Sequence, residues 1–166
     1  MEKLADIVRE KYEKLTRMLI SRRVSVTTME SCTSGLVASL LTDTEGSSAI
    51  MKGAFITYSN EAKIRQGVSE QVIRDHGVYS SETAAAMAQA CRRIYDADIG
   101  IGVTGSFGNK DPNNQDSIPG EVFFSIDTKT GTETYHCTVP EQPARLAYKL
   151  FVANEIADKL LLISRE

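Results

Sequence analysis

The segment from residue 24 to 42 constrains the fold more than any other, because a strand pattern turns there directly into a helix pattern. The β-branched run 24–28 predicts a buried strand, and apolar pairs at 36–37 and 40–41 predict a helix over about 33–42. Between them lie the hydroxyls, thiol and carboxylate of residues 30–34. This order is typical of α/β proteins, which bind ligands at the carboxyl ends of their strands.

The same alternation of strand and helix continues along the chain. Further strands are predicted at 54–58, 99–105, 121–126 and 133–138, the last two joined by a hairpin. Further helices are predicted at 3–22, 60–64, 69–77, 80–94 and from Pro143 onward. This pattern predicts one domain over residues 1–166, a three-layer α/β/α sandwich with a mixed, mostly parallel sheet.

Composition excludes several classes of protein. The chain of 166 residues has a net charge of −3 with both signs mixed, which disfavours a non-specific nucleic-acid binder. It has no apolar run long enough to span a membrane, and its charged N-terminus does not resemble a signal region, so a cytoplasmic protein is expected. Cys32, Cys91 and Cys137 lack metal-binding spacing, and neither a metal nor a cofactor is expected. Cys91 falls on the apolar side of a predicted helix and is expected in the core.

Three polar groups of residues directly follow predicted strands, at 30–34, 58–63 and 104–108. If these strands are parallel neighbours, the three groups meet at one rim of the sheet. The glycines of the strand 99–105 predict close approach of backbone or ligand, and residues 102–105 are expected to form a backbone wall against a ligand.

Ser31 is the candidate nucleophile at this rim, and Lys63 is the candidate base. A serine hydroxyl needs a partner to take its proton, and neither histidine is suitably placed, whereas a buried lysine can act as a base. The helix expected from Thr33 could hold an oxyanion with its N–H groups. The alternatives are that Ser31 and Thr33 only cap this helix, that Lys63 is a solvated surface residue, or that Cys32 is the nucleophile. Cys32 ranks below Ser31 because its side chain is expected to point the opposite way.

Two further side chains have a structural and a functional interpretation. Tyr58 could donate to a substrate oxygen or relay a proton to Lys63, or it could pack with its hydroxyl in water. Glu30 could orient Lys63 or bind a substrate hydroxyl, or it could accept from backbone N–H groups. Thr104 lies within expected reach of a ligand.

Four segments in this order resemble the signatures of the CinA C-terminal domain family, in its stand-alone form. They are Glu30-Ser31-Cys32-Thr33-Ser34-Gly35, Gly46-Ser47-Ser48-Ala49, Thr57-Tyr58-Ser59-Asn60-Glu61-Ala62-Lys63 and Gly102-Val103-Thr104-Gly105. The resemblance implies a metal-independent Ser/Lys amidohydrolase that deamidates nicotinamide mononucleotide to nicotinate mononucleotide and ammonia. It also implies a homo-oligomer with a small-molecule nucleotide substrate.

The motifs assign roles to individual residues. By resemblance, Ser31 is the nucleophile, Lys63 the base and Tyr58 a supporting catalytic group. The residues expected to contact substrate are Glu30, Thr33, Ser34, Gly35, Ser48, Thr104, Gly105 and Arg145.

Two segments, 106–112 and 140–142, depart from the family pattern. An arginine that would meet a phosphate is absent at 140–142, and Arg145 is a candidate substitute. The remaining alternatives are an amidase for a different carboxamide and a non-catalytic nucleotide-binding or oligomeric domain. A distance of roughly 3 Å between Lys63 Nζ and Ser31 Oγ would favour an enzyme.

Overall fold

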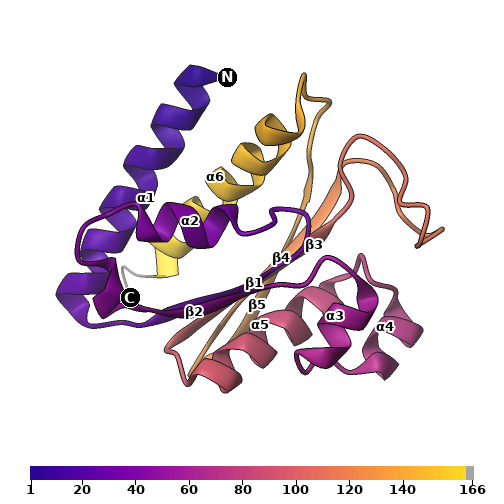
Figure 1. Ribbon diagram of the computed structural model, residues 1–166, viewed down its shortest axis with the longest axis horizontal. Helices are drawn as coiled ribbons and strands as arrows, with labels where there is room; N and C mark the ends of the chain where they lie inside the picture. The colour runs from indigo at the N-terminus through magenta and orange to yellow at the C-terminus, as the bar shows by residue number, and fades with distance from the viewer. Residues whose placement is uncertain (164–166) are drawn as a thin grey trace.

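A five-stranded mixed sheet forms the centre of the computed structural model, which describes residues 1–163 (Figure 1). The strands lie in the order β2-β1-β3-β4-β5. Their bounds are β1 Val26–Glu30, β2 Met51–Ile56, β3 Ile99–Gly105, β4 Glu121–Thr128 and β5 Gly131–Thr138. Strand β1 is parallel to both β2 and β3, and the β4–β5 hairpin continues the sheet in antiparallel pairing. The predicted mixed α/β sheet is therefore confirmed, although the strands pair in two parallel and two antiparallel pairs rather than mostly in parallel.

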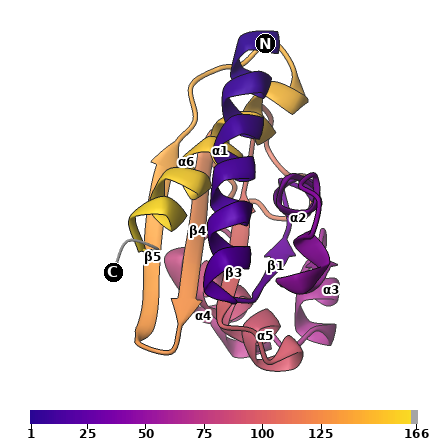
Figure 2. The ribbon, with the colours of Figure 1, turned by 90° about the vertical axis from the view of Figure 1, so that its left-hand side faces the viewer.

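Helices cover both faces of this sheet and make the three layers (Figures 1 and 2). One face carries α1 Glu2–Arg22, α2 Leu36–Thr42 and α6 Arg145–Ile163. The other carries α3 Asn60–Arg65, α4 Glu70–His76 and α5 Ser81–Tyr95. The larger hydrophobic cluster fills the first interface, and a smaller one around Met29, Met87 and Cys91 lies beneath α5. The prediction that Cys91 is a core residue is confirmed.

The glycines of β3 allow helix α5 to lie directly on the strand backbone. A Cβ added at Gly100 would come within 2.3 Å of the Ala88 carbonyl oxygen, and one at Gly102 within 2.3 Å of the Ala84 carbonyl oxygen. Real Cβ atoms do not approach backbone so closely, so these two positions require glycine. The close approach predicted for this strand is thus made by helix α5. Of the segment 102–105, which the sequence predicts to form a wall against a ligand, only Gly105 lines a cavity.

Several element boundaries differ from the sequence prediction. Strand β1 begins at Val26 because the left-handed Arg23 (φ 56°) ends α1 and the Ser25 N–H donates to the Asp98 carboxylate, although the Ser25 carbonyl already accepts from Ile99 of β3. Helix α2 begins at Leu36 rather than near Thr33, because Ser34 (φ 51°) and Gly35 (φ 90°) are left-handed. Strand β2 starts and ends earlier than predicted, and α6 begins after Pro143.

No helix among the described residues 1–163 is long and apolar enough to cross a membrane.

Candidate active site

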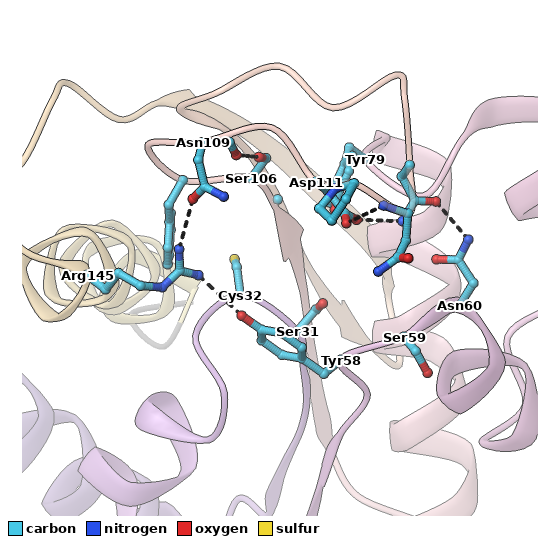
Figure 3. Close-up of a pocket in the computed structure, with 15 residues that line it drawn as sticks. Ser31, Cys32, Tyr58, Ser59, Asn60, Tyr79, Ser106, Asn109, Asp111 and Arg145 are labelled. Carbon is cyan, nitrogen blue, oxygen red and sulfur yellow. Dashed lines mark hydrogen bonds between the residues drawn. The ribbon is translucent and has the colours of Figure 1, made fainter.

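A cavity of about 470 Å³ opens at the carboxyl ends of the parallel strands, where the three polar groups of residues meet (Figure 3). Ser31 and Cys32 follow β1, Tyr58 to Asn60 follow β2, and Gly105 ends β3. The long loop 106–119 and Arg145 at the start of α6 complete the wall. The remaining lining residues are Tyr79, Ser106, Phe107, Asn109, Asp111, Pro112, Asn113 and Asn114.

Ser31 and Lys63 form a hydrogen-bonded pair at the base of this cavity. Lys63 Nζ lies 3.1 Å from Ser31 Oγ and 2.8 Å from the Thr57 carbonyl oxygen. Lys63 is in the short helix α3, whose N-terminus is capped by the Ser59 hydroxyl. Because helical side chains tilt toward the helix N-terminus, Lys63 reaches back beneath the strand ends. Its side chain is almost fully buried, at 1% exposure, so it is not a solvated surface lysine.

Burial also changes the protonation of Lys63. Loss of solvent lowers the pKa of its ammonium from 10.5 to about 8, against the smaller opposing effects of Cys32 and then of the Asp111 carboxylate. A substantial share of the side chain is therefore neutral near pH 8, as a general base must be.

Cys32 also lines the cavity, but its side chain packs into the larger hydrophobic cluster beneath α1, α2 and α6, whereas the Ser31 hydroxyl bonds Lys63 of helix α3 on the other face of the sheet. Burial, assisted by the negative charge of Glu30, raises the pKa of the Cys32 thiol to about 12. The thiol stays protonated at neutral pH and is a weaker nucleophile candidate than Ser31.

Glu30 is buried beneath helix α2 and does not reach the cavity. Its carboxylate accepts hydrogen bonds from the N–H groups of Val37 and Ala38, each at 3.0 Å, and from the Thr28 hydroxyl at 3.0 Å. The N-cap residue itself is Gly35, which supplies no side-chain cap. The structure therefore contradicts Glu30 as a substrate ligand, the N-terminus of α2 as an oxyanion site, and the capping role considered for Ser31 and Thr33.

Other predicted substrate contacts lie away from the cavity lining. Ser34 and Gly35 shape the left-handed turn, and Thr33 is fully buried with no partner for its hydroxyl among the described residues. Ser48 is exposed in the 3-10 turn Ser47–Ala49, which precedes β2 and so lies at the opposite end of that strand. The structure brings none of these four residues to the wall of this cavity.

The turn after Ser31 leaves two backbone donors without a backbone acceptor. The Ser31 N–H donates to the Val103 carbonyl and the Ser34 N–H to the Ser31 carbonyl, whereas the N–H groups of Cys32 and Thr33 bond no carbonyl within the described part of the chain, and the Cys32 N–H lies by its own thiol. N–H groups next to a nucleophile that lack a backbone acceptor are suitable donors for an oxyanion.

Arg145 lies at one end of the cavity and is held by three neighbours. Its guanidinium donates to the Tyr58 hydroxyl at 3.2 Å and to Asn109 Oδ1 at 3.4 Å, and it lies over the Phe107 ring at 5.4 Å. The Tyr58 hydroxyl therefore contacts Arg145 and not Lys63, so the relay considered from sequence is not formed.

Thr104 and Gly105 differ in their access to the cavity. The Thr104 hydroxyl is buried and donates to the Val78 carbonyl oxygen at 2.9 Å, which fixes the segment before α5 to the end of β3. Gly105 forms part of the cavity wall.

Sequence reasoning missed a polar network on the opposite wall. The Asp111 carboxylate accepts from the Tyr79 hydroxyl and Asn114 Nδ2, each at 2.6 Å, and from the Asn113 N–H at 2.9 Å. Asn114 Oδ1 in turn accepts from Asn60 Nδ2 at 2.9 Å, next to the start of α3. The only local signal is Asp111 followed by an N–H donor two residues on, an Asx turn that is common in surface loops.

The fold and the site define a class: an α/β sandwich with a buried serine–lysine pair under a polar cavity at the carboxyl ends of its parallel strands. The family profile described as the CinA C-terminal domain matches residues 9–155, and the chain belongs to this family.

Individual relatives agree with this assignment. The chain is 38% identical over 130 residues to a CinA-like protein of Shewanella denitrificans, covering 78% of this chain and 30% of that protein. It is 47% identical over 97 residues to a CinA-like protein of Chloroherpeton thalassium, covering 58% and 23%. The chain thus spans less than a third of the length of the curated relatives it matches.

Solved structures extend the likeness to the whole fold. A crystal structure of a competence-damaged protein (CinA) superfamily protein from Escherichia coli superposes with a TM-score of 0.85 at 25% identity, covering 94% of this chain and 90% of that chain. A competence/damage inducible protein from Agrobacterium tumefaciens superposes with a TM-score of 0.81 at 26% identity, covering 94% and 96%.

Proposed function

We propose that this protein is a metal-independent Ser/Lys amidohydrolase that deamidates nicotinamide mononucleotide to nicotinate mononucleotide and ammonia. One observation carries the proposal: the 3.1 Å contact between Lys63 Nζ and Ser31 Oγ at the base of a cavity. Family membership supports it, because the resemblance of the motifs to the deamidases implies the same pair.

The first half of the reaction would form an acyl-enzyme. Neutral Lys63 takes the proton of the Ser31 hydroxyl as Oγ bonds to the amide carbon, and the carbonyl oxygen becomes an oxyanion. The N–H groups of Cys32 and Thr33 are the candidate donors to that oxyanion. Collapse of the tetrahedral intermediate breaks the C–N bond while Lys63 returns the proton to the departing nitrogen, which leaves as ammonia.

The second half would release the acid. Lys63, neutral again, takes a proton from a water molecule that attacks the Ser31 ester. When the C–Oγ bond breaks, Lys63 gives this proton to Ser31 Oγ and the enzyme is restored. The product carries a carboxylate where the substrate carried a carboxamide.

The cavity suits a nucleotide in size and charge. Its volume of about 470 Å³ lies within the usual range of ligand sites, roughly 300–1,000 Å³. Arg145 presents its guanidinium at one end, and this planar fork of donors binds phosphate well. We assign it to the phosphate of the mononucleotide.

The experiment that tests this function measures ammonia release from nicotinamide mononucleotide by the purified protein. Wild type should turn over, while Ser31→Ala and Lys63→Ala should each lose at least about 100-fold in kcat. Ser39→Ala and Lys52→Ala, which replace exposed residues of the same types, are the matched controls. Full activity in Ser31→Ala or Lys63→Ala would exclude the pair as the catalytic machinery.

Two further measurements, ammonia release from other carboxamides and the melting temperature with the mononucleotide, separate the two alternatives. Turnover of other carboxamides but not of the mononucleotide would indicate an amidase of different specificity. A rise in melting temperature with the mononucleotide, without any consumption, would indicate a nucleotide-binding domain.

A further inference from the structure

The cavity has charges of opposite sign on its two walls. In Figure 3 Arg145 lies to the left of Ser31 and Asp111 lies above it, and both residues line the cavity. Neither forms an ion pair with another described residue. Each charge is therefore available to a molecule bound between them.

The Asp111 side chain is fixed rather than mobile in solvent. Oδ2 accepts from both Tyr79 and Asn114, and Oδ1 accepts from the N–H of Asn113. The Asp111 N–H is itself anchored by the Ser117 hydroxyl at 2.8 Å. Because a carboxylate oxygen has two acceptor positions, Oδ1 retains one that no described residue fills.

All donors to this carboxylate are neutral, so its negative charge persists and lies within reach of the catalytic groups. The Asp111 charge helps to hold the pKa of Lys63 higher than burial alone would. Against desolvation, which raises it, the hydrogen bonds from Asn114 and Tyr79 lower the pKa of Asp111, and the charge of Lys63 adds a smaller lowering. A positive charge in a ligand above Ser31 would interact with the same carboxylate.

We propose that Asp111 is a specificity residue that selects substrates whose carboxamide-bearing ring is positively charged. This inference rests on the proposed function. In the resulting pose the phosphate lies at Arg145, the amide carbon lies above Ser31, and the ring lies toward Asp111. The substrate class is then a dipolar nucleotide, anionic at one end and cationic at the other. Nicotinamide mononucleotide has this distribution, since its pyridinium ring is cationic, whereas its reduced dihydropyridine form has a neutral ring on the same phosphate and ribose.

The test compares three ligands that differ in the ring alone. Binding is measured by titration calorimetry at pH 8, with Ser31→Ala as the background so that nothing is hydrolysed. The ligands are nicotinamide mononucleotide, its reduced form and ribose 5-phosphate. Adding Asp111→Asn should lower the affinity for the oxidised mononucleotide roughly tenfold and change the affinity for the other two ligands by no more than about twofold. Asp116→Asn, an exposed residue of the same loop outside the cavity lining, should change none of them.

Ribose 5-phosphate reports on the integrity of the loop, because it carries the anion but no ring. Equal weakening of all three ligands by Asp111→Asn would show that Asp111 only anchors the loop, and the proposal would be overturned. Equal affinity of the oxidised and reduced forms for the Ser31→Ala background would overturn it as well.

The outcome is separable from that of the activity assay. Charge-selective binding without ammonia release would refute the deamidase function and keep the binding preference. Ammonia release from both ring forms at equal kcat/KM would support a deamidase and refute the role of Asp111.

Discussion

The two connections that supply the proposed reactive pair satisfy the first N–H groups of the following helix in different ways. Each leads from a parallel strand into a helix at the same rim, and each helix needs acceptors for its first N–H groups. In the β2–α3 connection, the Ser59 hydroxyl caps the helix locally. In the β1–α2 connection, the buried Glu30 carboxylate reaches from the end of the strand to the N–H groups of Val37 and Ala38.

The difference explains why a serine in one connection is free for chemistry. With Glu30 satisfying helix α2, the Ser31 hydroxyl has no capping role and bonds Lys63 instead. In the other connection the serine is used as the cap, and the reactive group is a lysine one turn further into the helix. The helix that lacks a local cap is thus the one that follows the candidate nucleophile.

The largest expected effect comes from removing the lysine delivered by the locally capped helix. Lys63→Met should lower kcat by about 10²–10⁴-fold, because the proposed general base is lost. It should also raise the stability of the protein at pH 7, since a buried lysine whose pKa is lowered from 10.5 to about 8 disfavours folding. The gain is at most about 3.5 kcal/mol, at ~1.4 kcal/mol per pKa unit.

The change of this stability gain with pH follows from the number of protons that the folded and unfolded states bind. Below pH 8 the lysine is protonated in both states, and the gain of Lys63→Met is full. Between about 8 and 10.5 only the unfolded state stays protonated, so wild type becomes more stable as pH rises and the gain shrinks. Urea unfolding at pH 7 and pH 10 measures this. A gain that does not shrink would contradict the assignment of a lowered pKa.

Glu30→Gln tests the long-range cap. The neutral amide keeps one acceptor but turns a donor toward the second helix N–H, so the free energy of unfolding should fall by about 2 kcal/mol. Denaturant unfolding gives the value, and kcat should also fall because the Ser31 turn is disturbed. An unchanged stability would mean that α2 does not depend on this carboxylate.

Ser59→Ala tests the local cap and should cost less. Loss of one neutral cap lowers the free energy of unfolding by about 1 kcal/mol. The exposed Ser39→Ala in helix α2 serves as the control in the same unfolding assay. If Ser59→Ala costs more than Glu30→Gln, the ranking of the two caps is wrong.

The smallest expected effect concerns the Asp111 charge above the pair. Activity should rise with pH as Lys63 loses its proton, with a midpoint near pH 8. Asp111 raises the pKa of Lys63, so Asp111→Asn should move the midpoint to lower pH, by less than about one unit. The profile of kcat/KM, which reports groups of the free enzyme, measures this, with Asp116→Asn as control. A shift to higher pH would contradict it.

Sequence patterns predict the sheet and the pairing of Ser31 with Lys63 because both depend on local periodicity and on one topological rule. Parallel neighbouring strands bring their carboxyl ends together, so residues 32 positions apart meet. The role of Glu30 could not be read in this way. A carboxylate beside a candidate nucleophile suggests a functional role. Only the structure shows that β1 ends at Glu30, so that Glu30 and Thr28 lie on the same face of the strand beneath α2.

The polar network around Asp111 could not be predicted for a different reason. Its contacts join a loop to Tyr79, which precedes another helix, and to Asn60 through Asn114. No periodicity connects these segments, and a polar loop with prolines carries no information on which of its side chains point inward.

The missing Cβ atoms at Gly100 and Gly102 determine the dimensions of the cavity although neither residue lines it. Helix α5 rests on bare backbone there, and the segment just before the helix carries Tyr79 into the wall. The distance between helix α5 and strand β3 is therefore short, because glycine has only a hydrogen atom where other residues have a side chain. A methyl group at position 102, 2.3 Å from the Ala84 carbonyl oxygen, would force the helix outward and shift the Tyr79 wall away from Ser31. The space available to a substrate in the cavity thus depends on how closely helix α5 packs on strand β3.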